Sequence, residues 1–436
     1  MQGWARPPLQ KIASASRAKM NRNKLKRLHC RNNKRKIFMI CVGIDIAKGK
    51  STVCFLKPGG EVLRTPYDIP HTAEEITKLI RDIRLYDEEV RVVLEATGHY
   101  HLPVVAQLLE ANVFVCVVNA LRMKKFCAQD IRKAKTDKID AAKIAAFGLT
   151  YWQDLQPAKP TDEVYRELRL LSRQYFQLTS MLVKAKISLG NLLDNVMPGI
   201  TDLLQDREPH HKLTDFVLKY LHFDKISSIG EKKFISGYCS WAKKQGYRMY
   251  ERQAEEILAL VQNSIPALPM TPSTTIVVKE AIRVVREIET SRASILAQMQ
   301  TFAKSLPEYS LIRSIACVGD TLTPLVIAEI GDVRNFHSKH ALIAYAGIDA
   351  PPYHSGNFYG TERHISKRGN GYLRRVGFEI MQCKLRFKPE GDVVYDFVQK
   401  KRSEGKIGKE AMVAGINKFL RIYYGKVTEL YRELEA

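Results

Sequence analysis

A buried carboxylate constrains this chain more than any other feature of its sequence. Residues 39–56 form a run rich in β-branched and other apolar residues, and Asp45 lies inside it between Ile44 and Ile46. This pattern predicts a buried β-strand. Burying an unpaired carboxylate in such surroundings is energetically costly. Asp45 therefore needs hydrogen-bond donors, an ion-pair partner or a metal ion, and its partners must come from later in the chain.

The residues that follow alternate between strand-like and helix-like patterns. Short apolar runs are separated by stretches whose apolar residues recur every three or four positions. A Pro-Gly-Gly turn at 58–60 indicates that the first strands form an antiparallel meander. We therefore predict a mixed sheet covered by helices on both faces, the α/β layout of a ribonuclease-H-like domain. The expected strands after the first are 50–57, 61–67, 90–94 and 113–118, and the expected helices are 72–85 and 101–111.

A different pattern begins after Pro157-Ala158-Lys159-Pro160. Apolar residues over 168–196 alternate steps of three and four, which is the seam of a coiled coil rather than the wider stripe of a core helix. The seam recurs over 285–306, so two helices can pair within one chain or across a dimer. We expect a basic extension at 1–38, a catalytic domain at 39–155, a coiled-coil domain at 156–307 and a mainly helical domain at 308–436.

The charge of the chain favours a polyanionic partner. The formal net charge is +23, and residues 1–37 hold twelve Lys or Arg with no Asp or Glu, which leaves +11 for the rest. Nucleic acid is favoured over membrane, because no stretch approaches the roughly 20 apolar residues of a membrane span. The extension is expected to be disordered in isolation, either as a solvated tail or as an arm that touches phosphates.

The eight cysteines indicate a reducing compartment. They form no Cys-x-x-Cys pair and no zinc-type spacing with histidine, and several lie in apolar runs. We expect free thiols and a cytoplasmic protein.

Three later acidic residues are candidate partners of Asp45. Glu95 ends the strand 90–94, where its side chain emerges at the edge of the sheet. Asp137 and Asp140 are three residues apart at a helix start capped by Thr136, so both lie on one face of the first turn. Four converging carboxylates repel one another unless a cation intervenes, and such hard oxygen ligands suit Mg²⁺ or Mn²⁺.

Ordinary structural roles would also account for each acidic residue taken singly. Any helix favours an acid such as Asp137 near its N-terminus, and Glu95 could pair with Arg91 or a lysine. A strand Asp, a strand-end Glu and an Asp-x-x-Asp helix in this order favour the metal site over these explanations.

A polar, glycine-rich loop near 349–371 carries a candidate nucleophile. Ser355 lies between His354 and Gly356, and a serine hydroxyl attacks only when a base or metal takes its proton. Ser366 is the rival nucleophile, in what looks like a helix-capping context, and a loop that merely binds phosphate is the other alternative. The basic residues expected to contact nucleic acid are Arg363, Lys367, Arg368, Arg374 and Arg375.

These motifs resemble a known family, the DEDD-type insertion-sequence transposases that include the Piv DNA invertase. The resemblance rests on Gly43-Ile44-Asp45, Leu94-Glu95-Ala96-Thr97-Gly98, the segment 135–141, Ala344-Tyr345-Ala346-Gly347 and His354-Ser355-Gly356. It implies a RuvC-like domain, a coiled coil and a C-terminal transposase domain. It also implies that Asp45, Glu95, Asp137 and Asp140 bind metal and that Ser355 is the nucleophile.

The resemblance further implies the partners of the protein. Members of the family are guided by a structured RNA that pairs with donor and target DNA, and we expect a homo-oligomer, a dimer or tetramer. Two departures are visible. Residues 1–38 have no counterpart, and Cys317-Val318-Gly319-Asp320 stands where the family usually has Gly-hydrophobic-Gly.

Four functions remain in competition. The leading hypothesis is a DNA transposase or recombinase that uses the acidic tetrad and Ser355. The second is a RuvC-like, structure-selective nuclease that uses water. The third is an actin-like or sugar-kinase ATPase, for which residues 43–48 fit but no Asp-Gly-Gly strand follows. The fourth is a nucleic-acid-binding protein without catalysis, which metal-dependent strand cutting would exclude.

Overall fold

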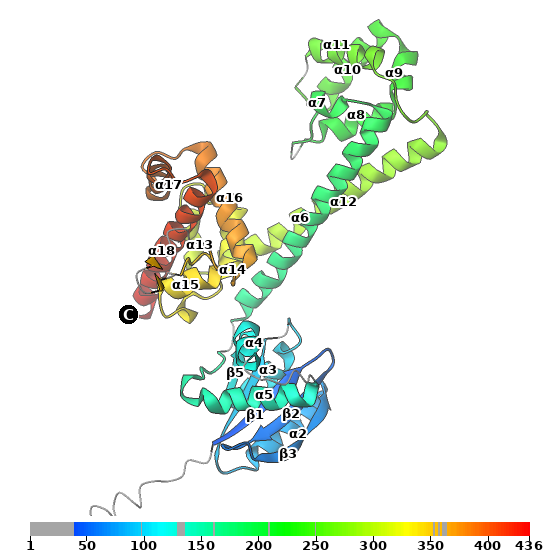
Figure 1. Cartoon of the computed structure of the whole chain (residues 1–436). Helices are drawn as coiled ribbons and strands as arrows, with labels where there is room; N and C mark the ends of the chain where they lie inside the picture. The colour runs from blue at the N-terminus through cyan, green and yellow to red at the C-terminus, as the bar shows by residue number, and fades with distance from the viewer. Residues whose placement is uncertain are drawn as a thin grey trace, which may run out of the picture. The chain divides into compact units, whose positions relative to one another are not determined.

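The computed structural model describes residues 39–96, 98–128, 136–159, 162–207, 210–248, 250–351 and 364–436, together with the backbone of 354–355 and 358–359. The predicted basic extension, residues 1–38, and Arg363 lie outside the described residues. The chain divides into two compact units, Met1–Pro160 and Thr161–Ala436 (Figure 1).

The first unit is built on a five-stranded mixed sheet. Its strand order is β3-β2-β1-β4-β5, in which β1 runs antiparallel to β2 and parallel to β4. The predicted antiparallel meander and the predicted mixed sheet are both confirmed. The strands are β1 (Met39–Ile46), β2 (Lys50–Leu56), β3 (Val62–Pro70), β4 (Glu89–Glu95) and β5 (Val115–Val118).

Helices cover both faces of this sheet. On one face α2 and α3 bury Ile76 and Leu108 against strand residues such as Ile44. On the other face α4 and α5 bury Met123 and Phe147 against residues such as Cys41. Successive strand residues point to opposite faces, so a strand with two covered faces is apolar throughout. The helices are α2 (Ala73–Arg84), α3 (Leu102–Glu110), α4 (Ala120–Cys127) and α5 (Asp137–Thr150).

Helix α5 crosses β1 at Gly43 with no room for a side chain. A methyl group at this position would overlap the carbonyl oxygen of Ala141 and the amide of Ala145. The backbone of β1 therefore lies directly against the backbone of α5. Glycine is required here for close approach rather than for an unusual backbone conformation.

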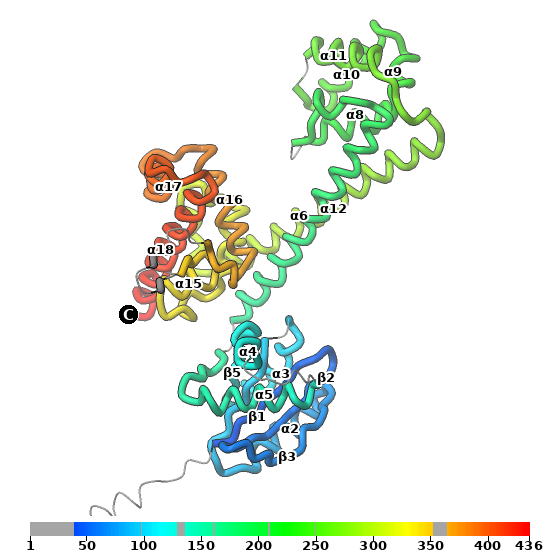
Figure 2. Tube along the Cα trace, in the orientation of Figure 1, coloured from blue at the N-terminus to red at the C-terminus, as the bar shows by residue number. Residues whose placement is uncertain are grey.

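Two long helices, α6 (Glu163–Val196) and α12 (Pro272–Lys304), form a stalk in the second unit. They lie side by side in Figures 1 and 2. The seam residues Leu182, Leu189 and Val285 are buried in one common cluster. Of the two predicted pairings, the structure therefore has the one within a single chain.

A small helical subdomain, which we call the helical tip, connects α6 to α12 (Figure 1). Aromatic residues form its core, with the rings of Phe216, Tyr238 and Trp241 in mutual contact. The sequence predicted helical content for this region and nothing more. Its helices are α7 (Ile200–Leu203), α8 (Lys212–Tyr220), α9 (Phe223–Ile229), α10 (Glu231–Lys244) and α11 (Glu251–Asn263).

The remaining residues form a helical bundle on the opposite end of the stalk. Tyr165 of α6 donates to the buried carboxylate of Glu308 at 2.6 Å, and Tyr431 donates to the same group at 2.7 Å, which fastens the stalk to the last helix. The bundle contains α13 (Glu308–Arg313), α14 (Leu322–Ile330), α15 (Lys339–Ala346), α16 (Gly371–Phe387), α17 (Val393–Ser403) and α18 (Gly408–Glu435).

Some elements were not predicted. The polar loop near 349–371 contains a short hairpin of β6 (His354–Ser355) and β7 (Phe358–Tyr359). Helix α17, within the segment predicted to be mainly helical, buries little beyond Val394 and Val398 and so lacks a wide apolar stripe. The seven cysteines among the described residues are free thiols. Within the same residues, no helix is both long and apolar enough to cross a membrane.

The contact at Gly43 generates a stability prediction. Gly43→Ala should destabilise the first unit by roughly 1–3 kcal/mol, because the sheet and α5 must move apart to accept the methyl group. Gly190→Ala in α6 is the control, since its added methyl group meets no atom within 4 Å. That variant should stabilise the chain by about 0.5–1 kcal/mol. Chemical denaturation measures both, and an unchanged Gly43→Ala midpoint would contradict the close approach.

Candidate functional site

The strand register places Asp45 next to Glu95. Strands β1 and β4 are parallel with Ile44 beside Leu94, so the following pair is Asp45 and Glu95. Both side chains are half-buried. Residues two positions earlier, Gly43 and Val93, face α5. Because strand residues alternate between faces, Asp45 and Glu95 project toward α5 as well.

The first turn of α5 carries the other two predicted acids. Thr136 caps the helix by accepting a hydrogen bond from the Ile139 amide at 3.3 Å, as the sequence predicted. Asp137 and Asp140 lie in that turn, and Asp140 precedes Ala141, the residue that touches Gly43. The four predicted acids therefore gather at one end of the sheet face that α5 covers.

Two residues that were not predicted complete this cluster. Asp68 on β3 pairs with Thr52 in the β2–β3 register, and Thr52 donates to its carboxylate at 2.6 Å. The Lys50 ammonium lies 3.3 Å from Asp68 and 3.1 Å from Asp137. The predicted strand 61–67 ends one residue before Asp68. The signal that would have found it is the strand register, which a single sequence does not display.

The charges in this cluster stabilise one another. Hydrogen bonds from Thr52 and then Lys50 lower the pKa of the Asp68 carboxyl. Hydrogen bonds to Asp137 and then Asp68 raise the pKa of the Lys50 ammonium. Lys50 is a positive charge among the acids, and its exposed ion pairs connect the first turn of α5 to the β2–β3 hairpin.

The acidic residues have the oxygen donors that suit a divalent cation, but the Asp137 carboxylate is bound to Lys50. Carboxylate oxygens are the ligands that Mg²⁺ and Mn²⁺ prefer. Among the described residues, no three His, Cys, Asp or Glu side chains meet closely enough to hold a metal ion. Asp137 binds Lys50 instead. A four-carboxylate metal site would therefore require the carboxylates to move closer together and Asp137 to leave Lys50.

The predicted serine loop has a rigid base. The Ser366 amide donates to the Asp349 carbonyl at 2.8 Å, and its hydroxyl donates to the Asp349 carboxylate at 2.5 Å. Nearby in the chain, Gly347, two residues before Asp349, and Gly369, three residues after Ser366, pack backbone against backbone. Ser355 pairs with Phe358 in the short hairpin inside this loop, and its side chain lies outside the described part. Ser366 thus closes the loop that contains Ser355, and Asn370 rather than Ser366 caps the next helix.

The predicted basic residues differ in how they are used. Lys367, Arg368 and Arg375 are exposed, although Arg375 also pairs with Glu379 at 3.0 Å. Arg374 donates to the Ala346 carbonyl at 2.8 Å, so it holds the base of the loop. The exposed three remain candidates for contacts with phosphate.

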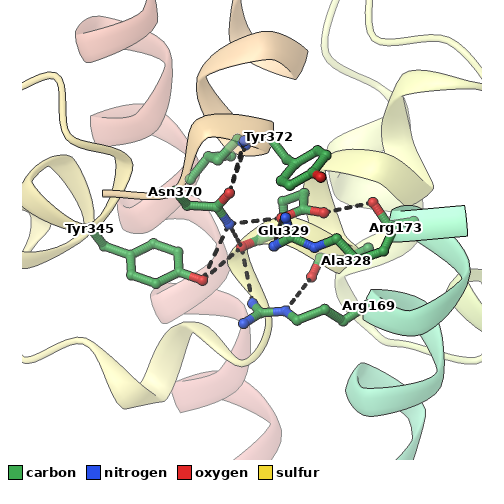
Figure 3. A network of polar contacts seen from close by, with 9 residues as sticks. Arg169, Arg173, Ala328, Glu329, Tyr345, Asn370 and Tyr372 are labelled. Atoms are coloured by element: carbon green, nitrogen blue, oxygen red, sulfur yellow. Dashed lines mark hydrogen bonds and ion pairs between the residues drawn. The ribbon is translucent and has the colours of Figure 1, made fainter. Parts of the chain in front are cut away.

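A buried carboxylate joins the stalk to this loop (Figure 3). Glu329 is fully buried and accepts hydrogen bonds from Ser172 at 2.7 Å, Arg173 at 2.9 Å and Asn370 at 2.7 Å. Asn370 also caps α16 by accepting from the amides of Tyr372 and Leu373. The carboxylate therefore links α6, the end of α14 and the start of α16.

Further contacts surround the same carboxylate. The Arg173 guanidinium lies over the Tyr372 ring, 3.8 Å from its centroid, and Tyr345 donates to the Glu329 carbonyl at 3.2 Å (Figure 3). Glu329 was not predicted as a functional residue, although a lone acid in the apolar helix 322–330 is the same signal that singles out Asp45.

Two family models match the sequence. One, described as a transposase of the DEDD type of the insertion element IS110, matches residues 42–198. The other, described as "Transposase IS116/IS110/IS902 family", matches residues 309–396. The first range contains the four predicted acids, and the second contains the serine loop.

Individual relatives agree with these matches. The chain is 21% identical over 374 residues to an uncharacterized protein of insertion element IS110 from Streptomyces coelicolor, across 86% of this chain and 90% of that protein. It is 22% identical over 393 residues to the pilin gene-inverting protein of Moraxella bovis, across 89% of this chain and 95% of that protein. The RuvC structure of Thermus thermophilus covers 28% of this chain and 100% of its own, at 14% identity and a TM-score of 0.23.

The Glu329 network generates a second stability prediction. Glu329→Ala should cost about 3–5 kcal/mol, because it leaves a guanidinium, an amide and a hydroxyl without their buried acceptor. Glu379→Ala is the control, since it removes a half-exposed ion pair within one helix and should cost at most about 0.5 kcal/mol. Urea denaturation compares the two, and equal losses would contradict a central role for Glu329.

Proposed function

Because this chain belongs to the IS110 family of DEDD-type insertion-sequence transposases, we propose that it is a recombinase that cuts and rejoins DNA through an acidic tetrad and a serine. The observation that carries the proposal is the register that sets Asp45 beside Glu95, beneath the helix turn with Asp137 and Asp140. The pilin gene-inverting relatives support DNA as the substrate.

The acidic tetrad would hold Mg²⁺ or Mn²⁺. Such ions, when bound, stabilise negative charge on the attacking and leaving oxygens of a phosphodiester. Asp45 and Glu95 are fixed by their strands, whereas Asp137 is held by Lys50 at the start of α5. The fixed pair would anchor the ion, and the helix turn would have to bring both Asp137 and Asp140 closer to it once Asp137 is released.

Ser355 is the proposed nucleophile. Its Oγ would attack the phosphorus and lose its proton, while the bond from phosphorus to a deoxyribose oxygen breaks and that oxygen gains a proton. The resulting phosphoserine ester keeps the energy of the broken bond, so a second strand end can be joined by the reverse step. The loop base formed by Asp349 and Ser366 supports this assignment, because it holds together the ends of the loop that contains the hairpin.

The remaining partners rest on the family resemblance. We propose that a structured guide RNA pairs with donor and target DNA, that the protein works as a dimer or tetramer, and that it acts in the cytoplasm. The excess of basic residues suits both nucleic acids. The second candidate function is a metal-dependent nuclease that uses water, which the acidic residues alone would support.

The roles of the acids and the serine can be separated in one experiment. Labelled DNA is incubated with protein and Mg²⁺, denatured, and examined for label that stays with the polypeptide. Ser355→Ala should lose the covalent adduct and strand exchange while retaining DNA binding, whereas Ser366→Ala should retain the adduct at reduced yield. Asp45→Asn should lose all cutting. If Ser355→Ala still cuts DNA while Asp45→Asn does not, water is the nucleophile and the nuclease replaces the recombinase.

Metal binding should become tighter when Lys50 is removed. Lys50→Met takes a positive charge away from the site and frees Asp137, so we expect the affinity for Mn²⁺ to rise by roughly tenfold. Lys48→Met, an exposed lysine in the turn before β2, is the control and should change the affinity little. Calorimetric titration of Mn²⁺ into the metal-free proteins measures both. Unchanged or weaker binding by Lys50→Met would show that Lys50 does not compete with the ion.

A further inference from the structure

The helical tip contains a polar cavity of about 580 Å³. It lies between the end of α7, the start of α8, the turn before α11 and Gln253 of α11. The residues of this segment lie outside both matched family ranges, 42–198 and 309–396. Basic groups dominate the lining, with Arg207, His210, Lys212 and Arg248 on its walls and Asp202 as the acidic residue among them.

In the part of the chain that the structure describes, the cations of this cavity are not paired with acids. Arg207, Lys212 and Arg248 form no ion pair with any carboxylate of the described residues. The neighbouring acids Asp206 and Asp215 bind other groups. Asp206 accepts the Thr214 amide at 3.1 Å, and Asp215 pairs with Arg286 and Tyr247. Three positive side chains that form no ion pair among the described residues, against the one described acid Asp202 in the lining, favour an anionic ligand.

Lys212 is held in place by neutral groups. Its ammonium donates to the Gln253 side chain at 2.6 Å and to the Arg248 carbonyl at 3.0 Å. Gln253 is fixed in turn, because it donates to the Leu203 carbonyl at 2.9 Å and accepts from Tyr238 at 2.9 Å. Burial lowers the pKa of Lys212. An ammonium that is partly desolvated and held without a carboxylate gains from an arriving anion.

We propose that this cavity, the tip pocket, binds phosphate groups of a nucleic-acid backbone. The choice of nucleic acid over another polyanion rests on the proposed function, whereas the anionic character of the ligand rests on the cavity itself. The tip pocket would give the chain a phosphate contact distinct from the acidic tetrad and from the serine loop.

A pair of double variants tests this proposal in the full-length chain. Arg207→Ala with Arg248→Ala removes two charges from the tip pocket, while the Arg248 carbonyl that holds Lys212 remains. Lys232→Ala with Lys233→Ala removes two exposed charges from α10 of the same subdomain, away from the cavity. Fluorescence anisotropy measures binding of a labelled duplex DNA and of a labelled single-stranded RNA over a range of salt concentrations. Circular dichroism checks that each variant is folded.

The salt dependence distinguishes the outcomes. The pocket variant should weaken binding and reduce the slope of log affinity against log salt by about 1.8 on duplex DNA, or about 1.4 on a single strand, for two lost phosphate contacts. A loss on one polymer alone assigns the pocket to that polymer, and a loss on both assigns it to their shared backbone. Slopes equal to those of the α10 variant on both probes would overturn the pocket. If the unaltered chain binds neither probe, the pocket and the proposed function both fail.

Discussion

The contact between Gly43 and the backbone of α5 fixes the candidate catalytic site. It sets how closely the helix approaches the sheet, and the acids lie on either side of this contact, Asp45 two residues along the strand and Asp140 one residue before Ala141. Any side chain at position 43 would lift the helix and its two carboxylates away from the strands. The site therefore depends on the absence of a side chain at position 43.

Local patterns predicted much of the first unit. The apolar strands, the meander and the Thr136 cap follow from alternation, turn chemistry and capping, all of which act over a few residues. Register could not be predicted in this way. Lys50 contacts both Asp68 and Asp137 because of how β2 pairs with β3 and packs against α5, and residues 18 or 87 positions apart carry no local sign of these contacts.

In the second unit, the sequence predicted the long helices but not which surfaces they pack against. The seam pattern predicted two long helices, but the same pattern fits pairing within a chain or between chains, because a seam specifies an apolar edge and not its partner. Glu329 was overlooked for a related reason. Its partners Ser172 and Asn370 come from helices that are distant in sequence, and their polarity alone does not distinguish them from surface residues.

The stalk also has a consequence for how this chain can change over evolutionary time. Its two helices run to the tip and back, and the Leu268 amide donates to the Asn195 carbonyl at 3.1 Å, so the chain re-enters the stalk beside the point where it left. Closing a loop between neighbouring ends costs little more entropy when the loop is long than when it is short. The tip can thus be enlarged, shortened or exchanged with little strain on the bundle and the sheet, which makes it the part of the molecule most open to new specificity.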